Sequence, residues 1–218
     1  DDFRAGNYRP GGFHNLKAGL DAQGDIIAWR DHFVTFGKGE KPSALAEMRP
    51  ADFFPAGFVP AFLAEQSLIP LAAPTGAMRA PRSNAFAFVM QSFIEELAHA
   101  AGQDPLAFQL KLLGDKAMVG EGEAAFNAAR MKGVLQAAGE MSNWGKVRLP
   151  DREGMGIACY YSHRGFFAAV AHVAVSRAGE VVVKKIWTAG DVGSQIVNPS
   201  GATHQVVGLD QRLVAWRK

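Results

Sequence analysis

Hydrophobic and polar positions alternate in the first part of the chain as they do in β-strands. Strand-type residues occupy positions 15–20 and 26–36, and the turn sequence Asp21-Ala22-Gln23-Gly24 separates them. Glycine supplies the positive φ that such a turn needs. The pattern predicts a β-hairpin near the start of the chain.

Residues 37–83 have a different character, because prolines interrupt every short apolar run. Proline at this density opposes long helices and central strands. Bulky aromatic residues in the same segment oppose a disordered linker. We expect ordered but irregular chain that wraps over a core.

Three helices are predicted next, within residues 84–138. The first covers 84–101, where apolar residues recur at helical spacing; Ser83 or Asn84 can cap its start, and Gly102 can end it in the left-handed conformation. Asp104-Pro105 starts the second helix with a cap residue followed by proline, and the third covers about 124–138.

Strand patterns return at 156–161, 166–176 and 181–189, and a closing helix or tail over 198–218 contains Gln205. Strands, irregular chain, helices and strands in this order favour an α+β fold over a βαβ alternation. We expect one unit over 1–218. Its parts are 1–36 (β), 37–83 (irregular), 84–138 (helical), 153–193 (antiparallel β) and 198–218.

Composition and charge exclude several classes of protein. The 218 residues carry a net charge of +2, without a long run of one sign, so no nucleic-acid partner is expected. The single cysteine, Cys159, excludes an intramolecular disulfide framework and a cysteine-rich metal site. No apolar run approaches the ~18 residues of a membrane span.

Few residues have the spacing of a known catalytic group. None of the six histidines pairs with another at metal-ligand spacing on one element. Glu95 and Glu96 are adjacent on a helix and point about 100° apart, which is typical of a solvated face. A weaker alternative is a hydrolase that uses His163 or His172 with Asp191, although no Gly-x-Ser-x-Gly elbow supports it.

The segment 74–84, which leads into the first helix, is the best candidate for chemistry. Its small residues leave backbone N–H groups accessible, and a helix N-terminus adds partial positive charge. Arg79 and Arg82 offer guanidinium groups suited to an anion. The alternative is a capped loop whose arginines contact only solvent or carbonyl groups.

Several motifs in this region carry a family resemblance. The run from Gly76 to Ala85 (GAMRAPRSNA) is followed by QSFIEELAHAAG at 91–102 and by Asp104-Pro105, and other matching stretches occur at 7–10, 17–24, 128–131, 187–193 and 197–199. Together they closely resemble the molybdopterin-binding large subunit of the xanthine oxidase family. The nearest branch looks like the isoquinoline 1-oxidoreductase beta subunit and related aldehyde dehydrogenases. The similarity spans nearly all of residues 1–208.

The resemblance implies oxidation of an electron-poor carbon, in an N-heterocycle or an aldehyde, with oxygen derived from water. It implies a molybdenum–pterin cofactor in the complete subunit. Electrons would leave through a small [2Fe–2S] subunit and, in some members, a cytochrome c. Carried over by position, the cofactor contacts are Gly76, Ala77, Met78, Arg79, Ala80 and Gln205.

The departures from the family pattern are equally specific. The glycine-rich cofactor loops are absent, and no Gly-Glu is followed by proline, so the stretch that carries the catalytic glutamate is missing. Residues 209–218 do not align. We therefore expect an internal or truncated fragment of a larger subunit, which alone binds no cofactor, has no catalytic residue and turns over no substrate. A non-catalytic binding or interaction module that retains the fold is the alternative.

A fragment of this kind has consequences for partners and location. Its natural partner is the remainder of the large subunit, and without it we expect an exposed apolar face and self-association. The resemblance suggests a bacterial, periplasmic enzyme, although the chain itself carries no export signal.

Overall fold

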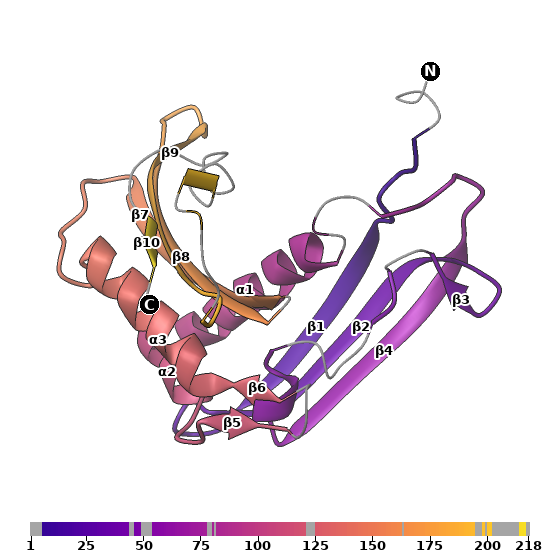
Figure 1. Cartoon of the computed structure of the whole chain (residues 1–218), viewed down its shortest axis with the longest axis horizontal. Coiled ribbons are helices and arrows are strands. Elements are labelled where there is room, and N and C mark those ends of the chain that lie inside the picture. Colours follow the sequence, from indigo (N-terminus) through magenta and orange to yellow (C-terminus); the bar gives the residue numbers. More distant parts are fainter. Residues whose placement is uncertain are drawn as a thin grey trace. The chain divides into compact units, whose positions relative to one another are not determined.

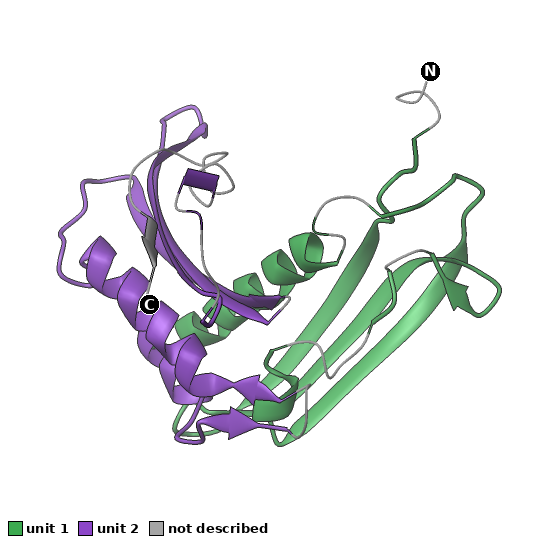
Figure 2. Ribbon diagram, viewed as in Figure 1, with its two compact units in different colours: residues 1–103 green, residues 104–218 purple. Residues whose placement is uncertain are grey.

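The computed structural model describes residues 6–43, 46–48, 54–77, 80, 82–120, 125–162, 164–194, 198, 200–201 and 214–216. The chain divides into two compact units, residues 1–103 and 104–218 (Figure 2). The hydrophobic pattern did not anticipate this division, because both units combine strands with a helix and no composition shift marks residue 103.

Unit 1 is built on a twisted sheet of four strands: β1 (Gly12–Leu20), β2 (Ile26–Lys38), β3 (Lys41–Pro42) and β4 (Ala61–Pro70). The predicted hairpin is confirmed: β1 and β2 pair antiparallel, and Gly24 in their turn has φ 75°. Figure 1 shows β1, β2 and β4 side by side.

Strand β4 corrects the prediction that residues 37–83 are irregular throughout. It pairs parallel with β2 over ten residues, from Ala28↔Ala61 to Gly37↔Pro70. Its sequence, AFLAEQSLIP, lacks a clean alternation of apolar and polar residues, and proline bounds it at both ends. Proline is tolerated there because β4 pairs with β2 alone and begins and ends at the edge of the sheet.

Helix α1 (Ser83–Ala100) covers one face of this sheet. Alternate residues of β2, from Trp29 through Phe33, point toward it and are buried. The ring of Trp29 meets Phe93 edge-on at a centroid distance of 4.8 Å, and Phe33 meets Phe86 at 5.4 Å. Burial of this aromatic layer is what fixes α1 on the sheet.

Unit 2 packs helices α2 (Pro105–Leu112) and α3 (Ala128–Ser142) on one face of a second sheet. Its strands are β7 (Glu153–Ser162), β8 (Gly165–Val175), β9 (Val181–Asp191) and β10 (Val214–Trp216). In this sheet β7, β8 and β9 pair antiparallel, and β10 pairs parallel with β9. Two short strands, β5 (Met118–Val119) and β6 (Phe126–Asn127), form a separate antiparallel ladder. The α+β class is therefore confirmed.

Helix boundaries show which local signals were informative. Asp104 caps α2 by accepting the N–H of Ala107, as predicted, and Gly102 has φ 64° after α1. The predicted cap of α1 is wrong: its N-cap residue is Arg82, and no side chain accepts a hydrogen bond there. The third helix starts at Ala128 rather than 124, because Phe126–Asn127 pairs with β5 and Asn127 then caps the helix.

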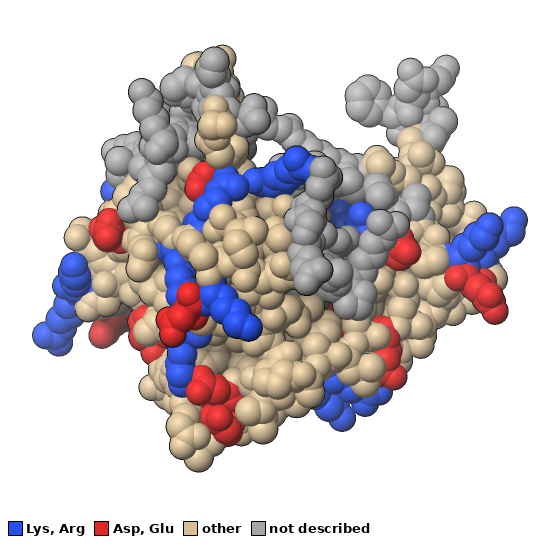
Figure 3. All heavy atoms as spheres, turned by 60° about the horizontal axis from the view of Figure 1, so that its bottom comes forward, with Lys and Arg blue, Asp and Glu red and all other residues tan. Residues whose placement is uncertain are grey.

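Charged side chains do not gather into one large patch on the face shown in Figure 3, where lysine and arginine are interspersed with aspartate and glutamate. This agrees with the small net charge of +2. Among the helices that the structure describes, none has the length and apolar character that crossing a bilayer requires.

Candidate functional site

The loop that leads into α1 is tied to the chain just before β1. Tyr8 and Thr75 form an isolated parallel bridge; the Tyr8 N–H donates to the Pro74 carbonyl at 2.9 Å, and the Gly76 N–H donates to the Tyr8 carbonyl at 3.1 Å. Two segments almost 70 residues apart in sequence thus share one short ladder, which gives the loop a fixed start.

Gly76 is required by this close approach. A Cβ atom at position 76 would lie 2.4 Å from Nδ2 and 2.8 Å from Cβ of Asn7, which is closer than carbon atoms pack. Any side chain there must displace Asn7 and with it the ladder at Tyr8. The glycine that the family resemblance singles out therefore has a physical role in positioning the loop.

Ala80 holds the other end of the loop in an unusual conformation. Its φ of 53° lies in the left-handed region, which costs a non-glycine residue about 1 kcal/mol or more. The Ala80 carbonyl accepts a hydrogen bond from Arg9 Nη1 at 2.9 Å and another from the Asn84 N–H at 3.3 Å. These two bonds hold Ala80 in place at the entrance of α1.

A small cavity of about 100 Å³ opens beside this entrance, within unit 1. The start of β1, strand β2 and the first two turns of α1 form its walls. Its polar side chains are Arg9, His14 and Arg82, and its apolar lining includes Phe33 and Phe86. Among the described residues that line it, none is acidic.

His14, which lines the cavity, belongs to a buried histidine–aspartate pair. His14 Nδ1 lies 2.9 Å and 3.0 Å from the two carboxylate oxygens of Asp31, and the exposed fractions of the two side chains are 8% and 0%. The imidazole stacks on Phe33 at 4.1 Å and meets the edge of Phe86 at 5.2 Å. Packing from both sides fixes the ring, so the pair is a rigid element of the cavity.

The structure describes half of the predicted cofactor contacts. Gly76 is buried with its N–H already bonded, whereas Ala77 and Ala80 are exposed. Met78, Arg79 and Gln205 lie outside the described residues. The sequence analysis missed Arg9 and His14, although Arg9 stands within one of the matching motifs.

Unit 2 does not bring together the proposed hydrolase residues. His172 Nε2 lies 2.6 Å from Glu153, and Asp191 is held instead by Arg130, at 2.9 Å and 2.6 Å from its two oxygens. That bidentate bond raises the pKa of Arg130. The hydrolase alternative on His172 is therefore wrong, and His163 lies outside the described residues.

Other candidate groups are structural. Cys159 is buried, and its thiol donates to Gln109 Oε1 at 3.3 Å, as expected for an unreactive core thiol. Glu96 is exposed, whereas Glu95 is half-buried, and this burial raises the pKa of Glu95. Within the described ranges, no three His, Cys, Asp or Glu side chains are grouped so that they could hold a metal ion.

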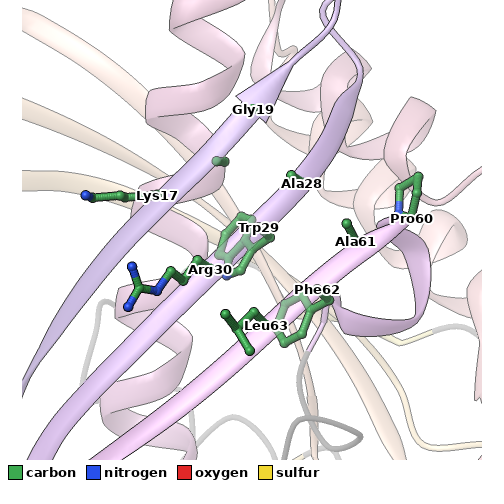
Figure 4. A pocket seen from close by; sticks show the side chains of 10 residues that line it. Lys17, Gly19, Ala28, Trp29, Arg30, Pro60, Ala61, Phe62 and Leu63 are labelled. Carbon is green, nitrogen blue, oxygen red and sulfur yellow. The ribbon is translucent and has the colours of Figure 1, made fainter.

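The outer face of the unit 1 sheet carries a wide, shallow hollow of about 620 Å³ (Figure 4). By the strand register, Gly19, Ala28 and Ala61 lie in one row across β1, β2 and β4, and the row's small side chains form the floor. Lys17 and Arg30 flank this floor. Trp29 also lines the hollow, and its Nε1 is a buried N–H for which the described residues supply no hydrogen-bond acceptor.

Sequence comparison finds two curated relatives. The chain is 34% identical over 126 residues to the membrane-bound aldehyde dehydrogenase [pyrroloquinoline-quinone] of Gluconacetobacter polyoxogenes, which covers 55% of this chain and 16% of that protein. It is 35% identical over 138 residues to a nicotinate dehydrogenase subunit of Pseudomonas putida, which covers 56% of this chain and 10% of that protein. No family model matches the chain.

The resemblance to part of a molybdopterin-dependent oxidoreductase is confirmed. The chain spans between a tenth and a sixth of the length of these curated relatives. Two solved structures also align with 81% of the chain and 21% of their own chains: the aldehyde oxidoreductases of Desulfovibrio gigas (TM-score 0.47, 17% identity) and Desulfovibrio desulfuricans (TM-score 0.45, 15% identity).

Proposed function

We propose that this chain is part of the large subunit of a molybdenum-dependent oxidoreductase that oxidises an aldehyde or an N-heterocycle such as nicotinate. Similarity to an aldehyde dehydrogenase and to a nicotinate dehydrogenase supports this class of substrate. The single observation that supports the proposal is the motif at 76–80, in which Gly76 lies too close to Asn7 to carry a side chain and Ala80 has a left-handed backbone conformation.

The residues present fit one wall of a site for an anionic pterin cofactor. Ala77 and Ala80 are exposed and present little more than backbone, buried Gly76 lets the motif pack against Asn7, and Arg9 and Arg82 add positive charge. When bound, such a cofactor supplies two-electron redox chemistry at molybdenum. The metal is held by the pterin in this family, so the wall itself needs backbone groups and cations rather than a cluster of metal ligands.

The chain's own contribution is then binding and orientation. The ladder between Tyr8 and Thr75 fixes where the loop begins, and the Arg9 bond to the Ala80 carbonyl fixes where it ends. The described residues on both sides of the motif are therefore fixed before a ligand binds, and this lowers the entropy lost on binding. The general base and the substrate pocket belong to other segments of the complete protein.

The isoquinoline branch, a [2Fe–2S] partner, a cytochrome c and a periplasmic location are finer parts of the same proposal. The name of the Pseudomonas relative describes one component of a multi-subunit enzyme, which is in keeping with such partners. The overall reaction balances as R–H plus water giving R–OH, two electrons and two protons, so an electron-accepting partner is required.

The test uses the full-length protein that contains this chain, purified from cells grown with molybdate or with tungstate. We expect oxidation of benzaldehyde or nicotinate with an artificial electron acceptor, loss of that activity after growth on tungstate, and incorporation of ¹⁸O from labelled water into the product. Activity that is unaffected by tungstate, or oxygen that derives from O₂, would contradict the proposal.

A further inference from the structure

The first residues of strand β9 form an open edge on the sheet of unit 2. β10 pairs with β9 only over residues 188–190, and within the described residues no other strand pairs with this edge. The three valines that begin β9, Val181, Val182 and Val183, are 65%, 53% and 49% exposed. Consecutive exposed valines at an open edge favour pairing with another strand, because backbone hydrogen bonds and apolar contact are both available there.

The backbone groups of Val181 and Val183 face this open edge. Val175, which pairs with Val181, donates its N–H to the Arg152 carbonyl at 2.8 Å, on the side away from β9. In an antiparallel ladder the two residues of such a pair direct their N–H and C=O groups away from each other, and the direction alternates along each strand. Val181 and Val183 therefore each present a donor and an acceptor to the edge, whereas the backbone groups of Val182 point to β8.

The turn before these valines is held in place by Ser176. The Ser176 N–H donates to the Glu180 carbonyl at 2.8 Å, and Ser176 Oγ accepts from the N–H groups of Ala178 and Glu180 at 3.2 Å and 3.1 Å. Glu180 is exposed, and the side chain of Lys184, on the other side of the valines, is 49% exposed. The segment Glu-Val-Val-Val-Lys is therefore complementary in charge to an antiparallel copy of itself.

We propose that two copies of this chain pair antiparallel along this edge, about a two-fold axis at Val182. This register places Val182 opposite Val182 of the second copy, and Val181 opposite Val183. Each pair of Val181 and Val183 then exchanges both of its backbone hydrogen bonds. Glu180 lies opposite Lys184 of the second copy, and the symmetry gives this stabilising pair of opposite charges twice.

The charges also oppose the neighbouring registers. An axis at Lys184 would bring the two Lys184 side chains together, and like charges directly opposite each other destabilise a strand pair. An axis at Val183 would place Lys184 opposite the apolar Val182 and Glu180 opposite Ile186. Of these registers, the one centred on Val182 pairs charge with opposite charge and valine with valine.

Apolar contact extends beyond the axis. Val173 and Val175 of β8 pair with two of these valines, so the side chains of each pair share one face of the hairpin. Pairing two hairpins brings the two sets of valines together across the axis and removes their apolar surface from water. The interface is short, so a weak and reversible dimer is expected. The pairing rests on this strand edge alone and is independent of the proposed function.

The test is sedimentation of the 218-residue chain over a concentration series, with charge reversal at the two ends of the segment. We expect a reversible monomer–dimer equilibrium with a Kd of about 100 μM or tighter. Glu180→Lys and Lys184→Glu should each weaken the dimer about tenfold, because each turns both pairs of opposite charges into pairs of like charges. The double variant restores both pairs and should dimerise as wild type does. Lys146→Glu, at an exposed lysine elsewhere in unit 2, is the matched control and should leave the Kd unchanged.

A second readout locates the axis. Val182→Cys should form an intermolecular disulfide in oxidised glutathione, because opposite residues that exchange no backbone hydrogen bonds have Cα atoms about 4.5 Å apart. Val147→Cys, at a valine that is 49% exposed against 53% for Val182, is the control and should cross-link far more slowly. In the wild-type chain, which needs no variant to fold, the amides of Val181 and Val183 should exchange more slowly as concentration rises.

Three results would overturn the proposal. The first is a chain that stays monomeric throughout the concentration series. The second is a dimer that single charge reversals do not weaken or that the double variant does not restore, because self-association would then occur through another surface. The third is equal cross-linking of the two cysteine variants, which would mean that position 182 does not lie at an axis.

Discussion

Helices α1 and α3 differ in whether a side chain caps the backbone N–H groups of the first turn. At α3 the side chain of Asn127 accepts the Arg130 N–H at 2.9 Å, so the chain caps its own helix. At α1 no side chain caps the first turn, and a cavity with two arginines and a buried histidine lies beside it. The start of α3 is therefore stabilised by a side chain of its own segment, whereas the start of α1 depends on the loop that precedes it.

The two units also differ in how fully their buried polar side chains are hydrogen-bonded. In unit 2, Gln109 contacts both the Ile157 carbonyl and the Cys159 thiol, so its amide is satisfied within the core. In unit 1, His14 contacts Asp31 through Nδ1 and also lines the cavity, and the buried Nε1 of Trp29 finds no acceptor among the described residues. A satisfied network adds rigidity, whereas a buried polar group without a partner costs stability.

The largest loss of stability is expected when the buried pair of His14 and Asp31 in unit 1 is broken. Asp31→Ala leaves the His14 ring without its partner and should lower the free energy of unfolding by about 3 kcal/mol. Asp31→Asn keeps an oxygen that accepts from Nδ1–H and should cost about 1 kcal/mol. Urea titration followed by circular dichroism measures both. A loss for Asp31→Ala no larger than that for the exposed control Glu65→Gln would contradict the structural role of the pair.

A smaller change in stability is expected when the N-terminal residues of α3 and α1 are each replaced by alanine. Asn127→Ala removes a real cap and should destabilise the protein by about 1 kcal/mol, whereas Ser83→Ala at the start of α1 should change stability by less than ~0.5 kcal/mol. The melting temperatures of the two variants, compared with that of the wild type, test this prediction. Equal losses would mean that Ser83 caps α1 after all.

The smallest effect concerns Glu95, on α1. Burial raises the pKa of this carboxyl, and His99 only partly opposes the shift. The folded state therefore binds more protons than the unfolded state just above pH 4.5, and stability falls as the pH rises through that window. Glu95→Gln should flatten this slope and raise stability at pH 7 by about 0.3 kcal/mol, a value discounted for the half-exposed position.

Unfolding curves recorded between pH 4 and pH 7 test the Glu95 prediction, with Glu65 as a contrast. The hydrogen bond from Arg30, at 2.5 Å, lowers the pKa of Glu65, so the stability it adds is present above its unfolded pKa and is lost as the pH falls through the folded one. Opposite slopes from Glu95→Gln and Glu65→Gln are expected. A steeper dependence in Glu95→Gln than in wild type would contradict the sign.

Local chemistry made much of the fold predictable. The amphipathic spacing of α1, the Asp104 cap and the left-handed glycines at 24 and 102 are each decided within a few residues, and the structure confirms them. Strand β4 was not predictable in this way. Its ten residues become a strand only because β2 offers a free edge, which is information that lies 30 residues away.

The candidate site was predictable only in its motif. Gly76 and its neighbours were found through the family resemblance, and the structure adds the physical reason for that glycine. The His14–Asp31 pair was missed, since the predicted strand began at Asn15 and the two side chains meet diagonally across β1 and β2. Such a pair becomes visible only when the strand register is known.

The central claim, that the loop at 76–80 is one wall of a cofactor site, is tested most directly by the molybdenum content of the full-length protein. Elemental analysis should find about one molybdenum per chain in wild type and in Gly154→Ala, a control glycine with open space around it, because a mononuclear cofactor carries one metal. Gly76→Val, which displaces Asn7 and the loop, should fold with the same secondary structure but lose the metal. A Gly76→Val protein that retains the wild-type molybdenum content would contradict the account.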